Sequence, residues 1–110
     1  MGFAANSARL YMLISRQRDL ELEAHLISQH RLYLANAMSQ FIDLQARYEP
    51  GSEPARLLDS RIRMLQQADK AMEMQLNRIT NQAKAIEQEQ ESVRKMIDQN
   101  IKSSFGLMGK

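Results

Sequence analysis

Two histidines and a nearby glutamate are the side chains in this sequence that could bind a metal ion. His25 and His30 are five residues apart, so they point in different directions on a helix, where paired ligands need a spacing of three or four. Glu21 and His25 have that spacing, but two ligands without a third predict a solvated ion pair. Cysteine is absent, which excludes a thiolate zinc site, a disulfide framework and a cysteine nucleophile. We therefore predict no metal and no cofactor.

The remaining polar side chains do not form a pattern typical of catalysis. Glu87, Glu89 and Glu91 alternate along the chain, so on a helix they diverge and predict solvated surface rather than a cation site. The sequence has neither a glycine-rich phosphate loop nor a credible Ser-His-Asp set, and Thr80 is its only threonine. We expect that the protein is not an enzyme and has no catalytic or cofactor-binding residues.

Two helix-forming stretches carry these residues. They are separated by one segment that interrupts helix formation, Glu49-Pro50-Gly51-Ser52-Glu53-Pro54. Pro50 moves the preceding residue out of the helical region, Gly51 can adopt a positive φ, and Pro54 suits the first turn of a helix. Residues 7–48 and 55–105 contain neither Gly nor Pro and are rich in strong helix formers. We predict one all-α domain over 1–110, with helices at 6–48 and 54–104, a turn at 49–53 and an apolar tail at 105–110.

A short linker between two long helices favours an antiparallel hairpin over the alternative of one bent, continuous rod. Apolar residues recur every seven positions in both stretches, which is typical of coiled-coil packing. The intrachain seam is predicted to contain Leu13, Leu20, Ile27, Leu34, Phe41, Leu58, Leu65, Met72, Ile79, Ile86, Val93 and Ile97. In a hairpin that turns near residue 51, Arg31 lies close to Asp69, and this pair would set the register of the two helices.

The first helix carries more apolar residues than one seam can use. A second stripe is displaced around it and comprises Tyr11, Leu22, Leu26, Tyr33, Ala37 and Leu44. The second helix has a weaker extra set, Met64, Ala68, Ala71, Met74 and Ala85. A hairpin leaves such a stripe in water, and large exposed apolar patches usually mark a partner surface.

The two ends of the chain are apolar as well. Phe3 at one end and Phe105, Leu107 and Met108 at the other would lie at the same tip of a hairpin. They would form either a hydrophobic cap on a monomer or, as we expect, a contact between subunits. We therefore predict subunit–subunit contacts through these residues and through Tyr11, Leu22, Leu26, Tyr33 and Leu44.

Composition limits the other partners. The net charge is +2 and no long block of like charges is present, so we expect no nucleic-acid partner. The longest apolar run is Leu10 to Ile14, far short of the ~20 residues that a membrane span needs. The N-terminal residues lack the pattern of a secretory signal peptide. We expect a location outside the cell or at its surface, reached without a cleaved signal, with a cytoplasmic location as the alternative.

The organisation resembles the needle subunits of type III secretion systems, and the inner helical domain of flagellin is a related comparison. In needle subunits two prolines flank the turn, as Pro50 and Pro54 do here, and an Ile-rich segment ends in Phe, as 96–105 does here. The present chain is longer and continues past Phe105. The resemblance implies a small exported hairpin that polymerises around a channel, with the last part of the second helix lining it, and export machinery as a further partner.

Two functional hypotheses remain at this point. The first is a structural subunit that self-assembles into a helical filament or tube, or into a closed four-helix bundle if the contact does not propagate. The second is a dimeric coiled-coil adaptor or export chaperone in the cytoplasm, whose second stripe holds a client helix. A small secreted hairpin of the type VII export class is a variant, although the Trp of its usual turn is missing because the chain contains no Trp.

Overall fold

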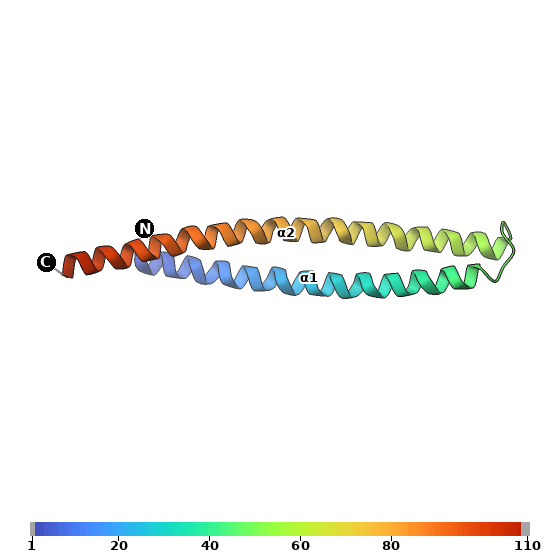
Figure 1. Cartoon of the computed structure of the whole chain (residues 1–110), viewed down its shortest axis with the longest axis horizontal. Helices are drawn as coiled ribbons and strands as arrows, with labels where there is room; N and C mark the ends of the chain where they lie inside the picture. The colour runs from blue at the N-terminus through green and yellow to red at the C-terminus, as the bar shows by residue number, and fades with distance from the viewer. Residues whose placement is uncertain (1, 109–110) are drawn as a thin grey trace. The chain divides into compact units, whose positions relative to one another are not determined.

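The chain folds into two long α-helices joined by a short turn (Figure 1). The structure, a computed structural model, describes residues 2–108, with the side chains of Leu107 and Met108 left out. Helix α1 spans Phe3–Gln45 and helix α2 spans Glu53–Met108. No strand is present within the described residues, so the prediction of an all-α hairpin is confirmed.

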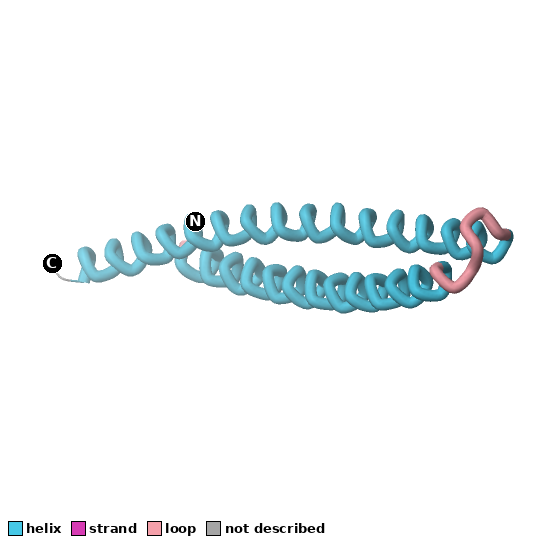
Figure 2. Tube along the Cα trace, turned by 45° about the vertical axis from the view of Figure 1, so that its right-hand side comes forward, coloured by secondary structure: helices cyan, strands magenta, loops and turns pink. Residues whose placement is uncertain are grey.

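Two compact units share these helices. Unit 1 combines Met1–Leu22 with Ile79–Lys110, and unit 2 comprises Glu23–Arg78. In each unit a stretch of α1 lies beside a stretch of α2 that runs in the opposite direction, as Figures 1 and 2 show. Unit 2 contains the connecting turn, and unit 1 contains both ends of the chain.

The connection in unit 2 is a tight turn with helical structure on both sides. The Ser52 amide donates to the Glu49 carbonyl at 3.1 Å, and Gly51 has φ of 83°. Pro50 followed by a positive-φ glycine is the arrangement of a type II turn. Ser52 caps α2, because its carbonyl accepts from the Arg56 amide and its hydroxyl from the Ala55 amide. The prediction that Pro50 and Gly51 form the turn and that Pro54 lies in the first turn of the next helix is therefore confirmed.

Both helices differ from the predicted bounds at their ends. Helix α1 begins three residues early, because the Gly2 carbonyl already accepts from the Asn6 amide. It ends at Gln45 rather than 48, because Arg47 and Tyr48 bond three residues back instead of four.

The predicted end of the second helix is also wrong. Helix α2 continues through Phe105 and Gly106 to Met108, whereas a stop and an apolar tail were expected from residue 105. A single glycine inside a helix costs only about 1 kcal/mol relative to alanine. Gly106 therefore weakens the helix without ending it, and the last two residues of the expected tail lie outside the described part.

The core of each unit is the line along which its two helix segments meet. Every residue predicted for the seam has a buried or half-buried side chain. In unit 1 the most deeply buried apolar side chains are Leu20, Ile79 and Val93. In unit 2 they are Leu34, Ala55, Leu58 and Ile62. The seven-residue period therefore identifies the packed side of both helices.

Candidate interaction surface

The packed line of unit 1 includes two amide pairs. Asn6 Nδ2 donates to Asn100 Oδ1, and Gln90 Nε2 donates to Gln17 Oε1, both at 2.8 Å. Asn6 and Gln90 are buried, and their partners are half-buried. The sequence analysis did not predict either of these pairs. A buried amide needs a partner, so each pair favours one alignment of the two helices.

Unit 2 contains the predicted Arg31–Asp69 pair. Arg31 Nε and Nη2 donate to the two carboxylate oxygens of Asp69 at 2.8 and 3.2 Å. The hydrogen bond from Arg31 lowers the pKa of Asp69 against the opposing effect of desolvation, and raises the pKa of Arg31. Both side chains retain about a third of their exposure. The pair is a structural contact within the helix interface.

Gln45 completes a regular series of polar side chains along α1. Gln17, Arg31 and Gln45 are two heptads apart on the same helical row, and Gln45 Nε2 donates to the Ala55 carbonyl at 3.0 Å. Each of the three bonds across to α2 within its own unit. These bonds specify the register in each unit, while the apolar residues between them supply most of the burial.

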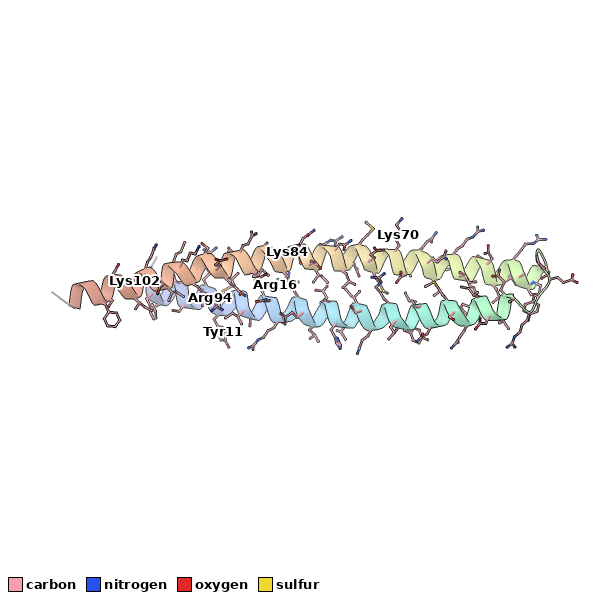
Figure 3. The ribbon with its side chains drawn as sticks, viewed as in Figure 1. Tyr11, Arg16, Lys70, Lys84, Arg94 and Lys102 are labelled. Atoms are coloured by element: carbon pink, nitrogen blue, oxygen red, sulfur yellow. The ribbon has the colours of Figure 1, made fainter. Side chains whose placement is uncertain are left out.

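The second stripe predicted for the first helix lies in water, apart from Ala37, which is half-buried. Tyr11 and Leu22 are exposed in unit 1, and Leu26, Tyr33 and Leu44 are exposed in unit 2. Figure 3 shows Tyr11 directed away from α2. Phe3 and Phe105 are exposed too, whereas the side chains of Leu107 and Met108 lie outside the described part. The structure places these residues on the surface, and their role as subunit contacts stays a prediction.

In unit 2 both helices contribute to one apolar surface. We define the apolar face as Leu26, Tyr33 and Leu44 of α1 with Leu57 and Met64 of α2, all of which are exposed. The sequence analysis did not single out Leu57. Its signal was present, since Leu57 lies seven residues before Met64 and the two therefore share a helical row.

Heptad geometry places the two halves of the apolar face on the same side of unit 2. In an antiparallel pair, the residues that directly precede one core row on each helix flank the same side. Ala37 on α1 directly precedes Met38, which lies on the same row as Arg31, and Ala68 on α2 directly precedes Asp69. Both alanines are half-buried. Tyr33 and Met64 lie four residues before them, one turn further along the same surface. The corresponding positions in unit 1 hold Arg9 and Glu89, which form an ion pair between the helices.

The other side of unit 2 differs because α2 supplies charge there. Arg63 and Asp59 form an ion pair at 2.9 Å, and Lys70 projects away from α1 (Figure 3). Leu32 and Ile42 of α1 are exposed on this side without apolar neighbours from α2 at the matching rows. Within unit 2, the exposed apolar side chains of both helices therefore share one side on the apolar face.

Unit 1 has its own apolar surface near the ends of the chain. Helix α2 extends beyond the first residue of α1 there (Figure 1). A shallow hollow is lined by Phe3, Ile101 and Phe105 together with Asn100 and Ser104. Phe3 and Phe105 were predicted to lie at the same tip of the hairpin, and the hollow brings them together.

Other kinds of site are not indicated in residues 2–108. No three His, Asp or Glu side chains come together there in a way that could hold a metal ion. Glu21 and His25 are both exposed on α1. Neither described helix contains a stretch that is long and apolar enough to cross a membrane.

Comparison with known proteins adds no relative. No family model, curated protein or solved structure matches the chain. The fold and its surface define the class as a two-helix antiparallel hairpin with polar pairs in its interface and apolar side chains left in water.

Proposed function

We propose that the protein is a structural subunit that self-assembles through the exposed apolar side chains of its hairpin. The observation that carries this proposal is the apolar face of unit 2, where five large side chains from two helices share one side. Each side chain of this size gains about 1.5–3 kcal/mol when it is fully buried. A hairpin alone cannot bury them, because its own core already uses the other side of each helix.

The distribution of these side chains favours an assembly that continues. Unit 2 carries the apolar face, and unit 1 carries Tyr11 and the hollow lined by Phe3 and Phe105. A subunit with two separate contact surfaces can bind two further copies, so assembly need not stop at a dimer. The product that this arrangement supports best is a helical filament or tube.

The resemblance to needle subunits supports an exported polymer. It rests on the turn flanked by Pro50 and Pro54 and on the Ile-rich segment that ends at Phe105. On this proposal the subunit is exported and acts outside the cell or at its surface. Export machinery would be a further partner.

Electron microscopy of the purified protein, concentrated and left to stand, tests the proposal when light scattering is followed alongside. Uniform filaments are expected. Leu26→Glu and Tyr33→Glu should abolish assembly and leave the helicity by circular dichroism unchanged, because both side chains are exposed in the hairpin. Gln66→Glu, at an exposed position on the charged side of α2, is the matched control and should assemble normally.

Other outcomes would contradict this function. A monomer across a wide concentration range would exclude self-assembly. Discrete dimers that retain one client protein would instead indicate an adaptor or export chaperone.

A further inference from the structure

We propose that the apolar face of unit 2 binds the same face of a second copy, with the two α1 segments antiparallel about a two-fold axis close to residue 35. This inference rests on the proposed self-assembly and adds the contact, its partner and its orientation. An interface of this kind uses one patch twice, so the patch must be complementary to itself. On the apolar face, self-complementarity concerns the sizes of the facing side chains, their charges and the area that they can bury.

The sizes of the α1 side chains are complementary about this axis. The rows that face the second copy contain Leu26, His30, Tyr33, Ala37, Gln40 and Leu44. When α1 is reversed about residue 35, Tyr33 lies opposite Ala37 of the second copy and Leu26 lies opposite Leu44. The ring of Tyr33 fits over a methyl group, and it already packs edge to face on His30 with ring centroids 6.4 Å apart. Alternation of large and small residues is what close helix packing requires.

Helix α2 supports the same axis independently. Arg31 bonds to Asp69, so residue 35 of α1 lies level with residues 65–66 of α2 within unit 2. Reversal of α2 about residue 66 puts Met64 opposite Ala68 of the second copy. A large side chain again meets a small one, at the level where α1 pairs Tyr33 with Ala37. One two-fold axis therefore satisfies both helices.

The ends of the apolar face carry opposite charges in the arrangement that this axis needs. Glu23 is exposed at one end of the α1 segment, and Arg47 is exposed just beyond Gln45 at the other. Reversal about residue 35 brings Glu23 of each copy level with Arg47 of the other, once at each end. A parallel pairing of the two α1 segments would instead place like charges level with each other. Opposite charges at the edge of an interface mainly favour one orientation of the partners, which is here the antiparallel pairing of the two α1 segments.

The exposed area is close to what a stable contact uses. Tyr33, Leu57 and Met64 each expose more than 60% of their surface, and Leu26 exposes 56%. With Leu44, these side chains present roughly 600 Å² per copy, compared with about 800 Å² per partner in a standard interface. The neighbouring alanines and the stems of His30 and Gln40 add the remainder.

Unit 1 is more charged than unit 2 at the matching α1 positions. They hold Arg9, Arg16 and Asp19 together with the exposed Met12, and Arg9 is already paired with Glu89 of α2. The proposed contact is therefore confined to unit 2.

Disulfide trapping between copies tests the contact and its orientation. The chain has no cysteine, so single-cysteine variants report one position each. The proposed axis places His30 opposite Gln40 of the second copy. An oxidised equimolar mixture of His30→Cys and Gln40→Cys should give about ten-fold more heterodimer than either variant alone gives homodimer. His25→Cys mixed with Gln40→Cys is the matched control, because His25 is exposed on the other side of α1.

A size exchange tests the packing. Ala37→Tyr should weaken association about ten-fold or more, because two tyrosines then meet. Adding Tyr33→Ala should restore association, since the large and small positions have only exchanged places. Sedimentation velocity measures the association, and circular dichroism verifies the fold of each variant.

The outcomes separate this inference from the proposed function. If the wild type assembles but the His30–Gln40 mixture cross-links no better than the control, this contact is wrong and self-assembly stands. If cross-links form instead between Gln40→Cys and Arg61→Cys, the copies pair α1 against α2 and the proposed orientation is wrong. If the wild type stays monomeric at every concentration, both proposals fail.

Discussion

Leu20 and Val93 are the most completely buried large apolar side chains of unit 1, each 1% exposed. They lie on opposite helices of a narrow interface, where few other residues can move in to replace a lost side chain. A residue in such a position contributes both its transfer free energy and the contacts of the residues around it. Leu22, two positions further along α1, is 59% exposed and contributes little to the isolated hairpin.

We expect Leu20→Ala to lower the free energy of unfolding by about 2–5 kcal/mol, because it leaves a cavity between the helices. Urea unfolding of dilute protein, followed by circular dichroism, measures the loss. Leu22→Ala is the control and should change stability by less than about 0.5 kcal/mol. Equal losses in both variants would mean that Leu22, and not the seam alone, is part of the intrachain core.

Arg31 and Asp69 provide the main pH-dependent contact in unit 2. Hydrogen bonding to Arg31 holds the pKa of Asp69 below its ordinary value in the folded chain. The unfolded state therefore binds more protons than the folded state in the acid range, and stability rises with pH there. The contribution is present above the unfolded pKa of about 4 and is lost as the pH falls through the lower, folded pKa.

Asp69→Asn should accordingly remove part of the stability loss seen between about pH 5 and pH 2. Urea midpoints of both proteins across this range measure the difference. Asp43→Asn, at an exposed position elsewhere on α1, is the control and should keep the wild-type slope. The same slope for wild type and Asp69→Asn would show that the ion pair does not form in solution.

The two helices are defined by their ends as much as by their packed sides. Gly51 holds a φ of 83° in the turn, a conformation that costs other residues about 1 kcal/mol or more. Gly106 lies inside α2, and a Cβ at either position would meet open space within the described residues. The same substitution should therefore have opposite effects at the two sites.

Gly51→Ala should destabilise the hairpin by about 1 kcal/mol, because alanine is strained at positive φ. Gly106→Ala should instead stabilise the end of α2 by about 0.5–1 kcal/mol, because alanine is the better helix former. Thermal unfolding and amide exchange near residue 106 measure the two effects. A stabilising Gly51→Ala would contradict the type II turn.

Within the described residues, most large apolar side chains outside the seam are exposed to water. They include aromatic residues of both units, and the proposed function assigns them to contacts between copies. The end of α2 is the part of unit 1 that bears most directly on that assignment. Phe105 is 71% exposed there and lines a hollow with Phe3.

Deletion of residues 105–110 should impair assembly, because it removes Phe105 and opens the hollow. Light scattering and electron microscopy of concentrated samples measure the effect, and circular dichroism shows whether the rest of the hairpin is kept. Deletion of residues 109–110 alone is the control and retains Phe105. Normal polymers from the larger deletion would show that the end of α2 is dispensable.

The two helices, the turn, the seam residues and the closeness of Arg31 to Asp69 could all be predicted from the sequence. These features follow from local preferences: helix formers without Gly or Pro, one proline–glycine break, and a seven-residue apolar period that selects one side of each helix. A short turn then leaves the antiparallel register almost no freedom, so the sequence alone predicts that Asp69 lies close to Arg31.

The ends of the helices, the pairing of the polar side chains and the side on which the surplus apolar residues gather depend on how the two helices pack. Asn6 pairs with Asn100 and Gln17 with Gln90 because the facing helix brings the partner within reach. Leu57 and Met64 join Leu26, Tyr33 and Leu44 on one face for the same reason. The seven-residue recurrence of apolar residues shows which side of a single helix they occupy. A surface made by two helices depends in addition on how the two helices are aligned.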